Sequence, residues 1–524
     1  MLLLLTFGLH LYSIGRESLW RDEVDTLHFA ADIWEQLKAS GSLTAAADEL
    51  AGYLVRPGWN GPLYFLAMEP WLQLAGRSEL ALRFPSVLAG LAAVTLSYAL
   101  GARLFGRLAG QLTALLMAIN PYLAWYAGEG KMYTLVIVLA LLSTYLLLRA
   151  CASGKKSLWP GYVLAVTLLF YTHILTPLLL PVQAILVLLL YPHVLRSPAV
   201  WLSAGAITLP YLPLLLWQWP QLAQPAETGF AFVPLPTMAQ RLGEVFGRGI
   251  IGWPAAIPLG LLLGAMGVGV VGAAQLAPPQ SPPQAGGKNR GGQPPRRRPP
   301  ARVGMRGGQP PRRRPPARVG MRGGLGLVLW AAVPVLELYL ISLRRPLFTE
   351  RYLIWTLPAW LLLAAGGLAA LARRGNMSRW LALGWTAGLV TVGLIGVGKQ
   401  WSTPVRADFR SAAAVVSGRY QAGELIVFQI PYLQATFDYY APQLDYLAAE
   451  GPYTNWGSSP AEVDAYLRQA TAGHARVWLL LSEAAMWDAR GLTTEWFQAH
   501  GRQLRQVALN RVKVTQWEIE AGPE

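Results

Sequence analysis

ESLWRDEVDTLHFA, residues 17–30, directly follows a segment rich in leucine, phenylalanine and tyrosine at the start of the chain. It places five charged side chains at the edge of that segment: Glu17, Arg21, Asp22, Glu23 and Asp25. Only 14% of the 524 residues are charged and 53% are hydrophobic, whereas a soluble domain carries about 25% charged residues. The composition therefore predicts a protein that lies mostly in a lipid bilayer, where such a cluster of charges is unusual.

Apolar windows long enough to cross a bilayer, about 17–25 residues each, recur along the chain. They cover residues 84–105, 109–127, 132–150, 157–173, 174–191, 199–217, 253–274, 325–343, 352–372 and 379–398. Residues 1–14 make an eleventh, short span, since no small-residue cleavage site follows them. We therefore predict a polytopic α-helical membrane protein with about 11 spans.

Basic residues between these spans fall in alternate loops, which the positive-inside rule places in the cytoplasm. The N-terminus is then cytoplasmic. The first outer loop, residues 15–83, and the tail from residue 399 lie on the outer side. We expect a multi-pass protein of the plasma or inner membrane, with residues 1–398 as its transmembrane domain.

Most of the net charge of +16 comes from one segment, residues 288–322, which contains twelve Lys or Arg residues and no acid. GGQPPRRRPPARVGMR occurs there twice, at 291–306 and 307–322. A repeat rich in Pro, Gly and Arg buries too little apolar surface to fold, so residues 280–324 are predicted to be a disordered basic cytoplasmic loop. It either touches anionic headgroups or is a neutral duplication. The charge does not indicate a partner nucleic acid.

Residues 399–524 have the composition of a small soluble domain. Residues 423–441, GELIVFQIPYLQATFDYYA, predict a strand, a turn at Pro431 and a helix. Residues 474–487 predict another strand leading into a helix, and residues 511–520 alternate like a terminal strand. We therefore expect an extracytoplasmic α/β domain at the C-terminus.

The first outer loop is predicted to fold into short helices rather than to be disordered. Helical periodicity is present in residues 26–37 and 46–55, and residues 60–76 carry enough aromatic side chains to lie in the membrane interface. The loop would then form a lid over the outer ends of the spans. Asp22 and Glu23 lie near its root.

Other polar residues fall at outer ends of different spans. They are Arg83, Glu129, Lys131, His173, Arg351 and Tyr352. Each has a structural alternative: an arginine can snorkel to headgroups, Glu129 and Lys131 can close a turn as an ion pair, and acids suit a helix start. Their occurrence together on one side of the membrane favours a site.

Such a site suits the transfer of a group carried on a lipid phosphate. Cations would hold the phosphate, and a carboxylate above them would accept the proton of an incoming hydroxyl or amine. One displacement at a sugar carbon inverts its configuration. The sequence has neither a P-loop nor a Rossmann glycine pattern, which favours a lipid-linked donor over a nucleotide sugar.

The chain resembles the GT-C-fold glycosyltransferases, in the group that contains protein O-mannosyltransferases and the lipid A aminoarabinose transferase. The resemblance runs from about residue 12 to 445, interrupted at 280–324, and is carried by SLWRDE, GPLYFLAMEPW, ALRFPSVLAG, YAGEGKMYTL and RYLIWTLPAWLLLAAGGLA. Two positions depart from the group. Asn60-Gly61 stands where many members have histidine and proline, and Glu129-Gly130-Lys131 where many have glutamate-alanine-arginine.

The resemblance implies Asp22 as the catalytic acid, with Glu23 beside it. It implies a donor-phosphate site made of Arg83, Lys131, Arg351 and Tyr352. Some members of the group bind a divalent metal and others do not, so the resemblance leaves the cofactor unknown, with a divalent metal possible near Glu129 and His173. On a helix, adjacent residues point about 100° apart, so we expect loss of the Glu23 charge to reduce activity less than loss of the Asp22 charge.

The predicted function is that of an inverting glycosyltransferase. Its partners would be a polyprenyl-phosphate-linked sugar, a protein, lipid or glycan acceptor on the outer face, and membrane lipids. The alternatives are a transporter or flippase for such lipids, which would show repeats among the spans, and a non-catalytic accessory protein that binds partners through residues 399–524.

Overall fold

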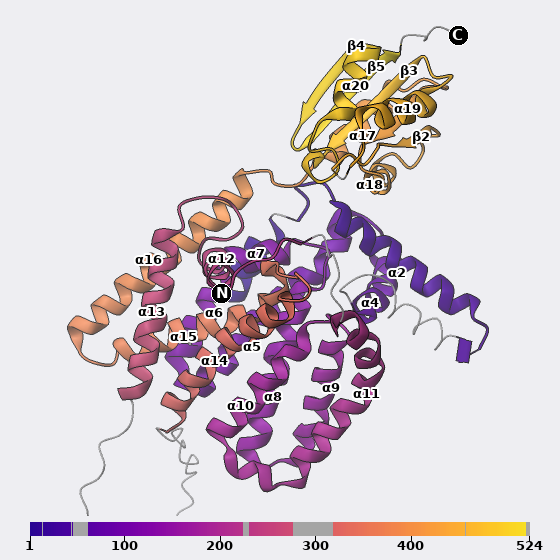
Figure 1. The fold of residues 1–524 in the computed structure, drawn as a ribbon. Helices are drawn as coiled ribbons and strands as arrows, with labels where there is room; N and C mark the ends of the chain where they lie inside the picture. The colour runs from indigo at the N-terminus through magenta and orange to yellow at the C-terminus, as the bar shows by residue number, and fades with distance from the viewer. Residues whose placement is uncertain are drawn as a thin grey trace, which may run out of the picture.

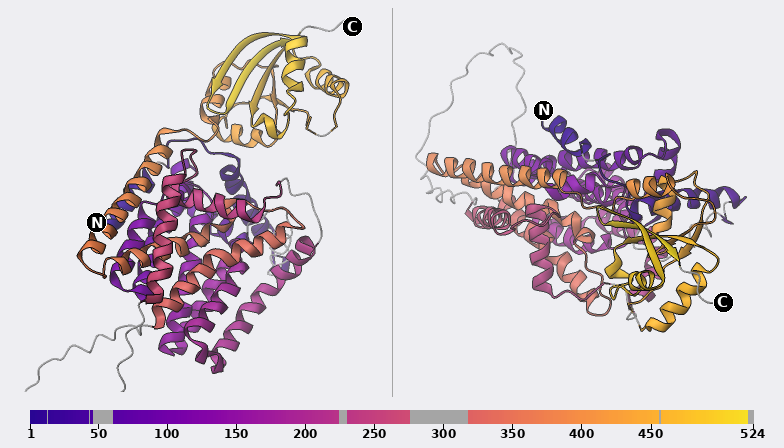
Figure 2. Two further views of the ribbon diagram at one scale, coloured as in Figure 1. Left: turned by 60° about the vertical axis from the view of Figure 1, so that its left-hand side comes forward. Right: turned by 90° about the horizontal axis from the view of Figure 1, so that it is seen from above.

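The computed structural model describes residues 1–519 apart from residues 13, 43, 46–60, 224–229, 276–317 and 456. Helices form a large bundle, and a smaller part containing a sheet lies over one end of it (Figures 1 and 2). The helix predicted over residues 46–55 and most of the predicted loop 280–324 lie outside the described residues. The described part of that loop, residues 318–324, is helical, so the predicted disorder is wrong there: α14 (Arg318–Ser342) begins inside the second repeat, because an established helix extends at little cost.

Six helices in the described part of the chain are long and apolar enough to cross a membrane. They are α5 (Glu79–Phe105), α8 (Tyr133–Ser153), α11 (Pro198–Ala223), α14, α15 (Leu357–Leu371) continuing the 3-10 helix η4 (Glu350–Thr356), and α16 (Asn376–Ser402). Shorter apolar helices are α1 (Leu2–Leu11), α9 (Trp159–Phe170), α10 (Leu179–Leu190) and α13 (Ala256–Gln275). The bundle suits a multi-pass membrane protein, but the number of 11 spans is not confirmed.

The predicted span 109–127 is broken into two helices, α6 (Arg107–Ala118) and α7 (Pro121–Ala127). At the break, the side-chain oxygen of Asn120 accepts a hydrogen bond from the backbone N–H of Leu123 at 3.0 Å. Asparagine at the N-cap followed by proline is a strong helix start, which hydropathy alone does not detect. After the break, α7 ends at Ala127, and the polar turn at residues 128–131 follows it directly.

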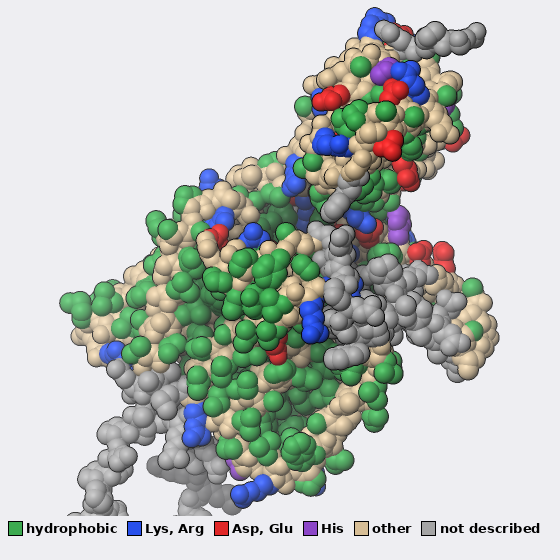
Figure 3. Space-filling model, in the orientation of Figure 1, with side chains coloured by type: hydrophobic (Ala, Val, Ile, Leu, Met, Phe, Trp, Pro, Cys, Tyr) green, Lys and Arg blue, Asp and Glu red, His purple; other side chains and the backbone are tan. Residues whose placement is uncertain are grey.

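Helix α15 lies at the centre of the bundle, and its span is completely buried. A Cβ atom at Gly367 of α15 would meet the carbonyl oxygen of Ala265 on α13 at 2.3 Å, so glycine allows the two helices to approach this closely. The outer surface of the bundle, by contrast, is covered with apolar side chains, whereas charged side chains gather on the C-terminal part (Figure 3). This distribution matches a bundle surrounded by lipid and a domain surrounded by water.

The segment between α1 and α5 contains two packed helices, α2 (Arg21–Ala39) and α4 (Pro62–Ala75). The rings of Phe29 and Phe65 lie 5.5 Å apart. The indole N–H of Trp34 donates a hydrogen bond to the carbonyl of Leu66 at 3.0 Å. Helices are therefore present where the sequence predicted them in residues 26–37 and 60–76.

The C-terminal part has a five-stranded sheet in the order β2-β1-β3-β5-β4. The strands are β1 (Leu425–Phe428), β2 (Leu447–Glu450), β3 (Arg476–Ser482), β4 (Gly501–Leu509) and β5 (Val512–Ile519). β1 pairs in parallel with β2 and β3, whereas β5 is antiparallel to β3 and β4.

Helices of the same part pack against this sheet. They are α17 (Phe409–Ser417), α18 (Leu433–Tyr440), α19 (Pro460–Thr471) and α20 (Leu492–His500). The predicted strand, turn and helix at 423–441 are present as β1 and α18. The helix predicted directly after β3 is only a 3-10 turn, η5 (Ala484–Met486). Glu483 enters that turn with a left-handed backbone, which a regular α-helix cannot contain.

Candidate active site

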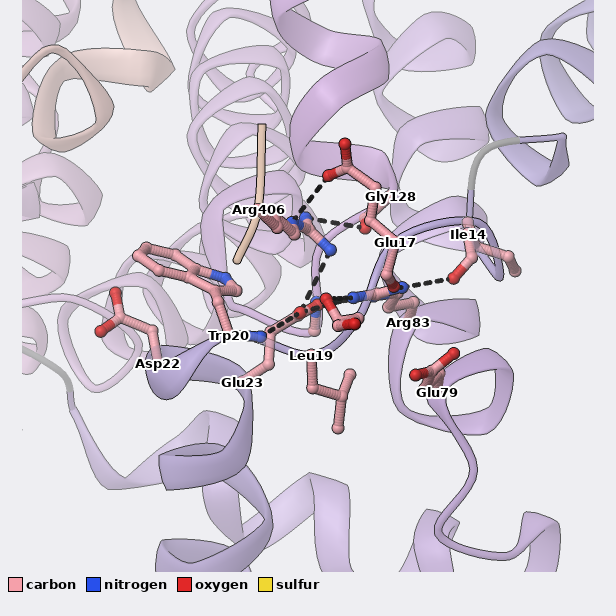
Figure 4. A network of polar contacts seen from close by, with 12 residues as sticks. Ile14, Glu17, Leu19, Trp20, Asp22, Glu23, Glu79, Arg83, Gly128 and Arg406 are labelled. Carbon is pink, nitrogen blue, oxygen red and sulfur yellow. Dashed lines mark hydrogen bonds and ion pairs between the residues drawn. The ribbon is translucent and has the colours of Figure 1, made fainter. Parts of the chain in front are cut away.

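Helix α2 begins at Arg21, and its first turn contains two acidic residues, Asp22 and Glu23. Figure 4 shows that their side chains point in different directions. Glu23 points inward and is completely buried. The Asp22 side chain, 27% exposed, points away from it and binds Arg351. The expected difference of about 100° between adjacent helical positions therefore separates them into two environments.

The carboxylate of Glu23 forms a buried ion pair with Arg83. The Nε and one terminal nitrogen of Arg83 donate to its two oxygens, each at 2.7 Å. The backbone N–H of Gly130 donates to the same carboxylate at 2.8 Å. Glu23 thereby joins α2, α5 and the turn at residues 128–131, and we propose a structural role for it.

The remaining donors of Arg83 are also used. They bind the backbone carbonyls of Ile14 at 2.6 Å, Glu17 at 2.9 Å and Ser18 at 3.0 Å. A guanidinium has five N–H donors, and the protein occupies all five while leaving the side chain with no exposed surface. The predicted phosphate-binding role of Arg83 is therefore not supported, because it has neither a free donor nor access to a ligand.

Arg406 is part of this network, although the sequence did not single it out. Its guanidinium donates to Glu23 at 3.1 Å and to the carbonyl of Gly128 at 3.2 Å (Figure 4). It also lies 5.1 Å from the centre of the Trp125 ring. Its position soon after the last apolar helix, on the expected outer side, is the only signal that the sequence offers.

The two arginines determine the charge state of Glu23. Burial by itself would raise the pKa of this carboxyl, but the attraction of Arg406 and Arg83, with the hydrogen bonds from Arg83 and Gly130, lowers it to about 2. Glu23 is therefore ionised at neutral pH and holds two buried cations in place.

Asp22 forms a single ion pair with Arg351, which η4 supplies, at 3.1 Å. The guanidinium lies between aromatic rings, 5.6 Å from the centre of the Trp20 ring and 5.8 Å from that of Tyr133. The Arg351 side chain is 23% exposed, and its Nε has no hydrogen-bond partner among the described residues. Unlike Arg83, Arg351 therefore has a free donor for a ligand.

The turn at residues 128–131 contributes two buried ionisable side chains. Both carboxylate oxygens of Glu129 are buried without a hydrogen-bond partner in the described part of the chain. Burial raises the pKa of Glu129 to about 7, an effect that Arg406 opposes and Glu23 reinforces. Burial lowers the pKa of Lys131, against the attraction of Asp22 and Asp25.

Glycine is required in the middle of this turn. A Cβ atom at Gly130 would lie 2.6 Å from Cγ of the buried Leu82. Glycine at position 130, where many members of the group have alanine, thus avoids a clash with Leu82 of α5, which packs directly on the turn.

Tyr352 and His173 lie behind Arg351. Their rings are 5.2 Å apart, and His173 is completely buried. The Nδ1 atom of His173 accepts a hydrogen bond from the backbone N–H of Leu175 at 3.3 Å, and its Nε2 has no partner among the described residues.

No group of three His, Cys, Asp or Glu side chains able to hold an ion occurs in the part of the chain that the structure describes. The suggestion that Glu129 and His173 hold a divalent metal therefore has no support from the geometry.

A cavity of about 220 Å³ lies between the bundle and the C-terminal part. Its walls include Trp20, Trp125, Tyr126, Glu129, Arg351, Arg406, Ser482, Glu483 and Arg511. Asp22 meets Arg351 beside it. Of the predicted site residues, the structure thus brings Asp22, Glu129 and Arg351 to one place, with Lys131, Tyr352 and His173 buried nearby. Glu23 and Arg83 form a separate structural pair.

Known proteins resemble this chain in sequence. Residues 57–217 match the family described as dolichyl-phosphate-mannose-protein mannosyltransferase. YkcB of Bacillus subtilis (strain 168), named as a candidate mannosyltransferase, is 24% identical over 155 residues, which cover 30% of this chain. The chain thus matches only 21% of that relative's length.

Solved structures share the fold over nearly the whole chain. ArnT from Cupriavidus metallidurans, bound to undecaprenyl phosphate, is 12% identical with a TM-score of 0.51, covering 98% of this chain and 97% of its own. AglB from Archaeoglobus fulgidus, in complex with an inhibitory peptide and a dolichol-phosphate, is 11% identical with a TM-score of 0.55, covering 98% and 73%. The predicted resemblance is therefore confirmed: the protein is a multi-pass membrane protein with the GT-C fold.

Proposed function

We propose that this protein is an inverting glycosyltransferase that moves a sugar from a polyprenyl-phosphate donor to an acceptor on the outer face of the membrane. The observation that carries the proposal is the meeting of Asp22 with Arg351, 3.1 Å apart, beside a cavity at the end of an apolar bundle. A carboxylate and a phosphate-binding cation are the two groups that a single displacement from a lipid phosphate requires. The GT-C fold and the lipid phosphates bound to both structural neighbours support it.

Arg351 and Lys131 are the proposed phosphate ligands. Arg351 keeps an unpartnered Nε, and Lys131 is a buried cation near Asp22 and Arg351. Tyr352, next to Arg351, adds a hydroxyl. A donor phosphate would compete with Asp22 for Arg351, so donor binding would release the carboxylate at the place where the acceptor arrives.

Asp22 is the proposed base. Its carboxylate takes the proton of the acceptor hydroxyl while the oxygen of that hydroxyl bonds to the anomeric carbon. The bond from that carbon to the phosphate oxygen breaks, and the polyprenyl phosphate leaves with the bonding electrons, held by Arg351 and Lys131. One displacement of this kind inverts the configuration of the sugar.

We place the site on the outer side. The C-terminal part lies at one end of the bundle, whereas α13 ends and α14 begins at the opposite end (Figure 1). The basic segment 288–322, for which the positive-inside rule predicts a cytoplasmic location, joins those two helix ends in the sequence. Residues 399–524 would then be extracytoplasmic.

The test is release of free polyprenyl phosphate from radiolabelled polyprenyl-phosphate sugars incubated with the purified protein. Asp22→Asn should lower turnover by about 10²–10⁴-fold while donor lipid still binds. Asp32→Asn, the same change on the same helix at a residue away from the cavity, is the matched control. Turnover of Asp22→Asn near the wild-type rate would contradict the assignment, and movement of the lipid across vesicles without release would indicate a transporter.

A further inference from the structure

The C-terminal part of the chain forms one wall of the cavity that Glu129 lines. Ser482 at the end of β3, Glu483 after it, and Arg511 in the turn between β4 and β5 all line it. The opposite wall comes from the bundle and the start of α2, through Glu129 and Trp20. A ligand in this cavity would therefore contact both parts of the protein at once.

Backbone strain is concentrated at this cavity. Glu483 and Arg511 are the two non-glycine residues with positive φ in the part of the chain that the structure describes, at 52° and 56°. A left-handed backbone is unfavourable for a residue with a side chain, and such strain clusters at ligand sites. Both strained residues line the cavity. The backbone that shapes this wall is therefore strained, which lowers the stability of the folded protein.

Polar atoms without partners lie on two of its walls. The Ser482 side chain is buried, and its Oγ has no hydrogen-bond partner among the described residues. The same is true of both carboxylate oxygens of Glu129 on the opposite wall. A buried polar group without a partner is destabilising, and a ligand with hydroxyl groups could bind both residues.

The charges around the cavity favour a neutral ligand. Each arginine that lines it has a carboxylate partner. The pairs are Arg21–Asp25 at 3.5 Å, Arg351–Asp22 at 3.1 Å, Arg406–Glu23 at 3.1 Å and Arg511–Glu483 at 3.9 Å. With the donor phosphate assigned to Arg351, no unpaired arginine remains on these walls for a second anion.

The remaining walls are aromatic, and their position disfavours a peptide strand. Trp20, Trp125 and Tyr126 line the cavity together with aliphatic side chains such as Ile250 and Leu433, and aromatic and aliphatic side chains suit the C–H faces of a sugar ring. A peptide that adds to a sheet needs a free edge strand, and the edges here are β2 and β4. Ser482 and Glu483 instead follow β3, the central strand of the sheet.

We infer that this cavity is the acceptor site, and that the acceptor is a neutral monosaccharide unit of a glycan whose hydroxyls bind Ser482 and Glu483. The inference rests on the proposed glycosyl transfer and adds the acceptor class to it. Ser482 and Glu483 are then specificity-determining residues contributed by the C-terminal part, and the acceptor lies on the Glu129 side of the donor phosphate.

The experiment uses the purified full-length protein with Ser482→Ala and Glu483→Gln. Glu518→Gln is the control, because Glu518 is an exposed carboxylate on the same sheet, paired with Arg502 and away from the cavity. Methyl glycosides of common hexoses serve as acceptors, with serine- and threonine-containing peptides in a parallel arm. Acceptor and donor KM are measured by release of polyprenyl phosphate, and glycoside binding without donor is measured by saturation-transfer NMR.

Each cavity variant should raise the KM for the glycoside by about tenfold or more, the loss expected for one hydrogen bond to a charged or buried group. The donor KM should not change, and Glu518→Gln should behave as the wild type. Unchanged glycoside KM in both variants, or release promoted by peptides and not by glycosides, would overturn the inference. If polyprenyl phosphate is released from none of the donors, the proposed function fails. The NMR signal of the glycoside, and its loss in the two cavity variants, still decide whether the cavity binds a sugar.

Discussion

Replacing Glu23 by glutamine should destabilise the protein, whereas the same change at Asp22 should not. The sequence led us to expect only a weaker loss of activity at Glu23. The structure changes that expectation, because the Glu23 carboxylate is buried and binds both Arg83 and Arg406. Glutamine keeps the shape but leaves two buried guanidinium groups without a counter-ion.

The magnitude follows from two independent arguments. Removing one partner of a buried ion pair costs about 3–5 kcal/mol. The lowering of the pKa of Glu23 from 4.5 to about 2 corresponds to about 3 kcal/mol of preference for the ionised form in the folded protein. Asp22 makes one ion pair and its side chain is 27% exposed, and a pair of that kind contributes about 0–1 kcal/mol.

The assay is thermal unfolding of the wild type, Glu23→Gln and Asp22→Asn in the same detergent, followed by tryptophan fluorescence. We expect a clearly lower midpoint for Glu23→Gln and a midpoint close to wild type for Asp22→Asn. If Glu23→Gln unfolds together with the wild type, the carboxylate does not hold the two arginines, and its structural role is wrong. A Glu23→Gln variant that is stable but inactive would instead restore the catalytic role expected from the sequence.

Three further predictions concern pH and ligands. The folded-state pKa of Glu23 is depressed, so its contribution to stability should be complete above about pH 4.5 and be lost as the pH falls toward 2; acid unfolding of the wild type should show this loss. Burial raises the pKa of Glu129 to about 7, so this carboxyl becomes ionised as the pH increases through neutrality. If the ionised form binds the acceptor hydroxyl, turnover should rise over the same pH range. Glu129→Gln should remove that rise without changing donor affinity. Arg351→Ala should weaken donor-lipid binding by tenfold or more, measured by lipid titration, whereas Arg83→Ala should lower the unfolding midpoint; equal donor affinity in the wild type and Arg351→Ala would move the phosphate site elsewhere.

Hydropathy and local sequence pattern predicted the positions of helices and strands correctly where the interactions that stabilise an element lie close together in the sequence. The apolar windows identified the bundle, because burying an apolar helix in lipid depends mainly on its own composition. The failure at 109–127 has the same origin: the window averages over Asn120, whose capping interaction ends one helix and begins another. A single hydrogen bond can divide a span that mean hydropathy shows as continuous.

The site was predicted as a set of residue types but not as a set of partners. Asp22 and Arg351, 329 positions apart, were both named as site residues and do meet. Arg83 and Glu23 were named for the same site, but they form a buried ion pair with each other instead. An isolated arginine in a sequence has five donors whatever its role, and only packing shows whether the protein or a ligand occupies them.

The sequence by itself determined the membrane class of this protein, the helices within residues 15–83, the strands of its C-terminal part and its resemblance to GT-C glycosyltransferases, since these depend on composition, periodicity and ordered motifs. Tertiary structure alone decided which charges are free. Arg406 reaches Glu23 across 383 positions, and Ser482 and Glu483 reach the Glu129 cavity from a different part of the chain. The physical reason is that the state of a charged group depends on burial and on the groups around it, both of which are set by contacts between segments that no local pattern connects.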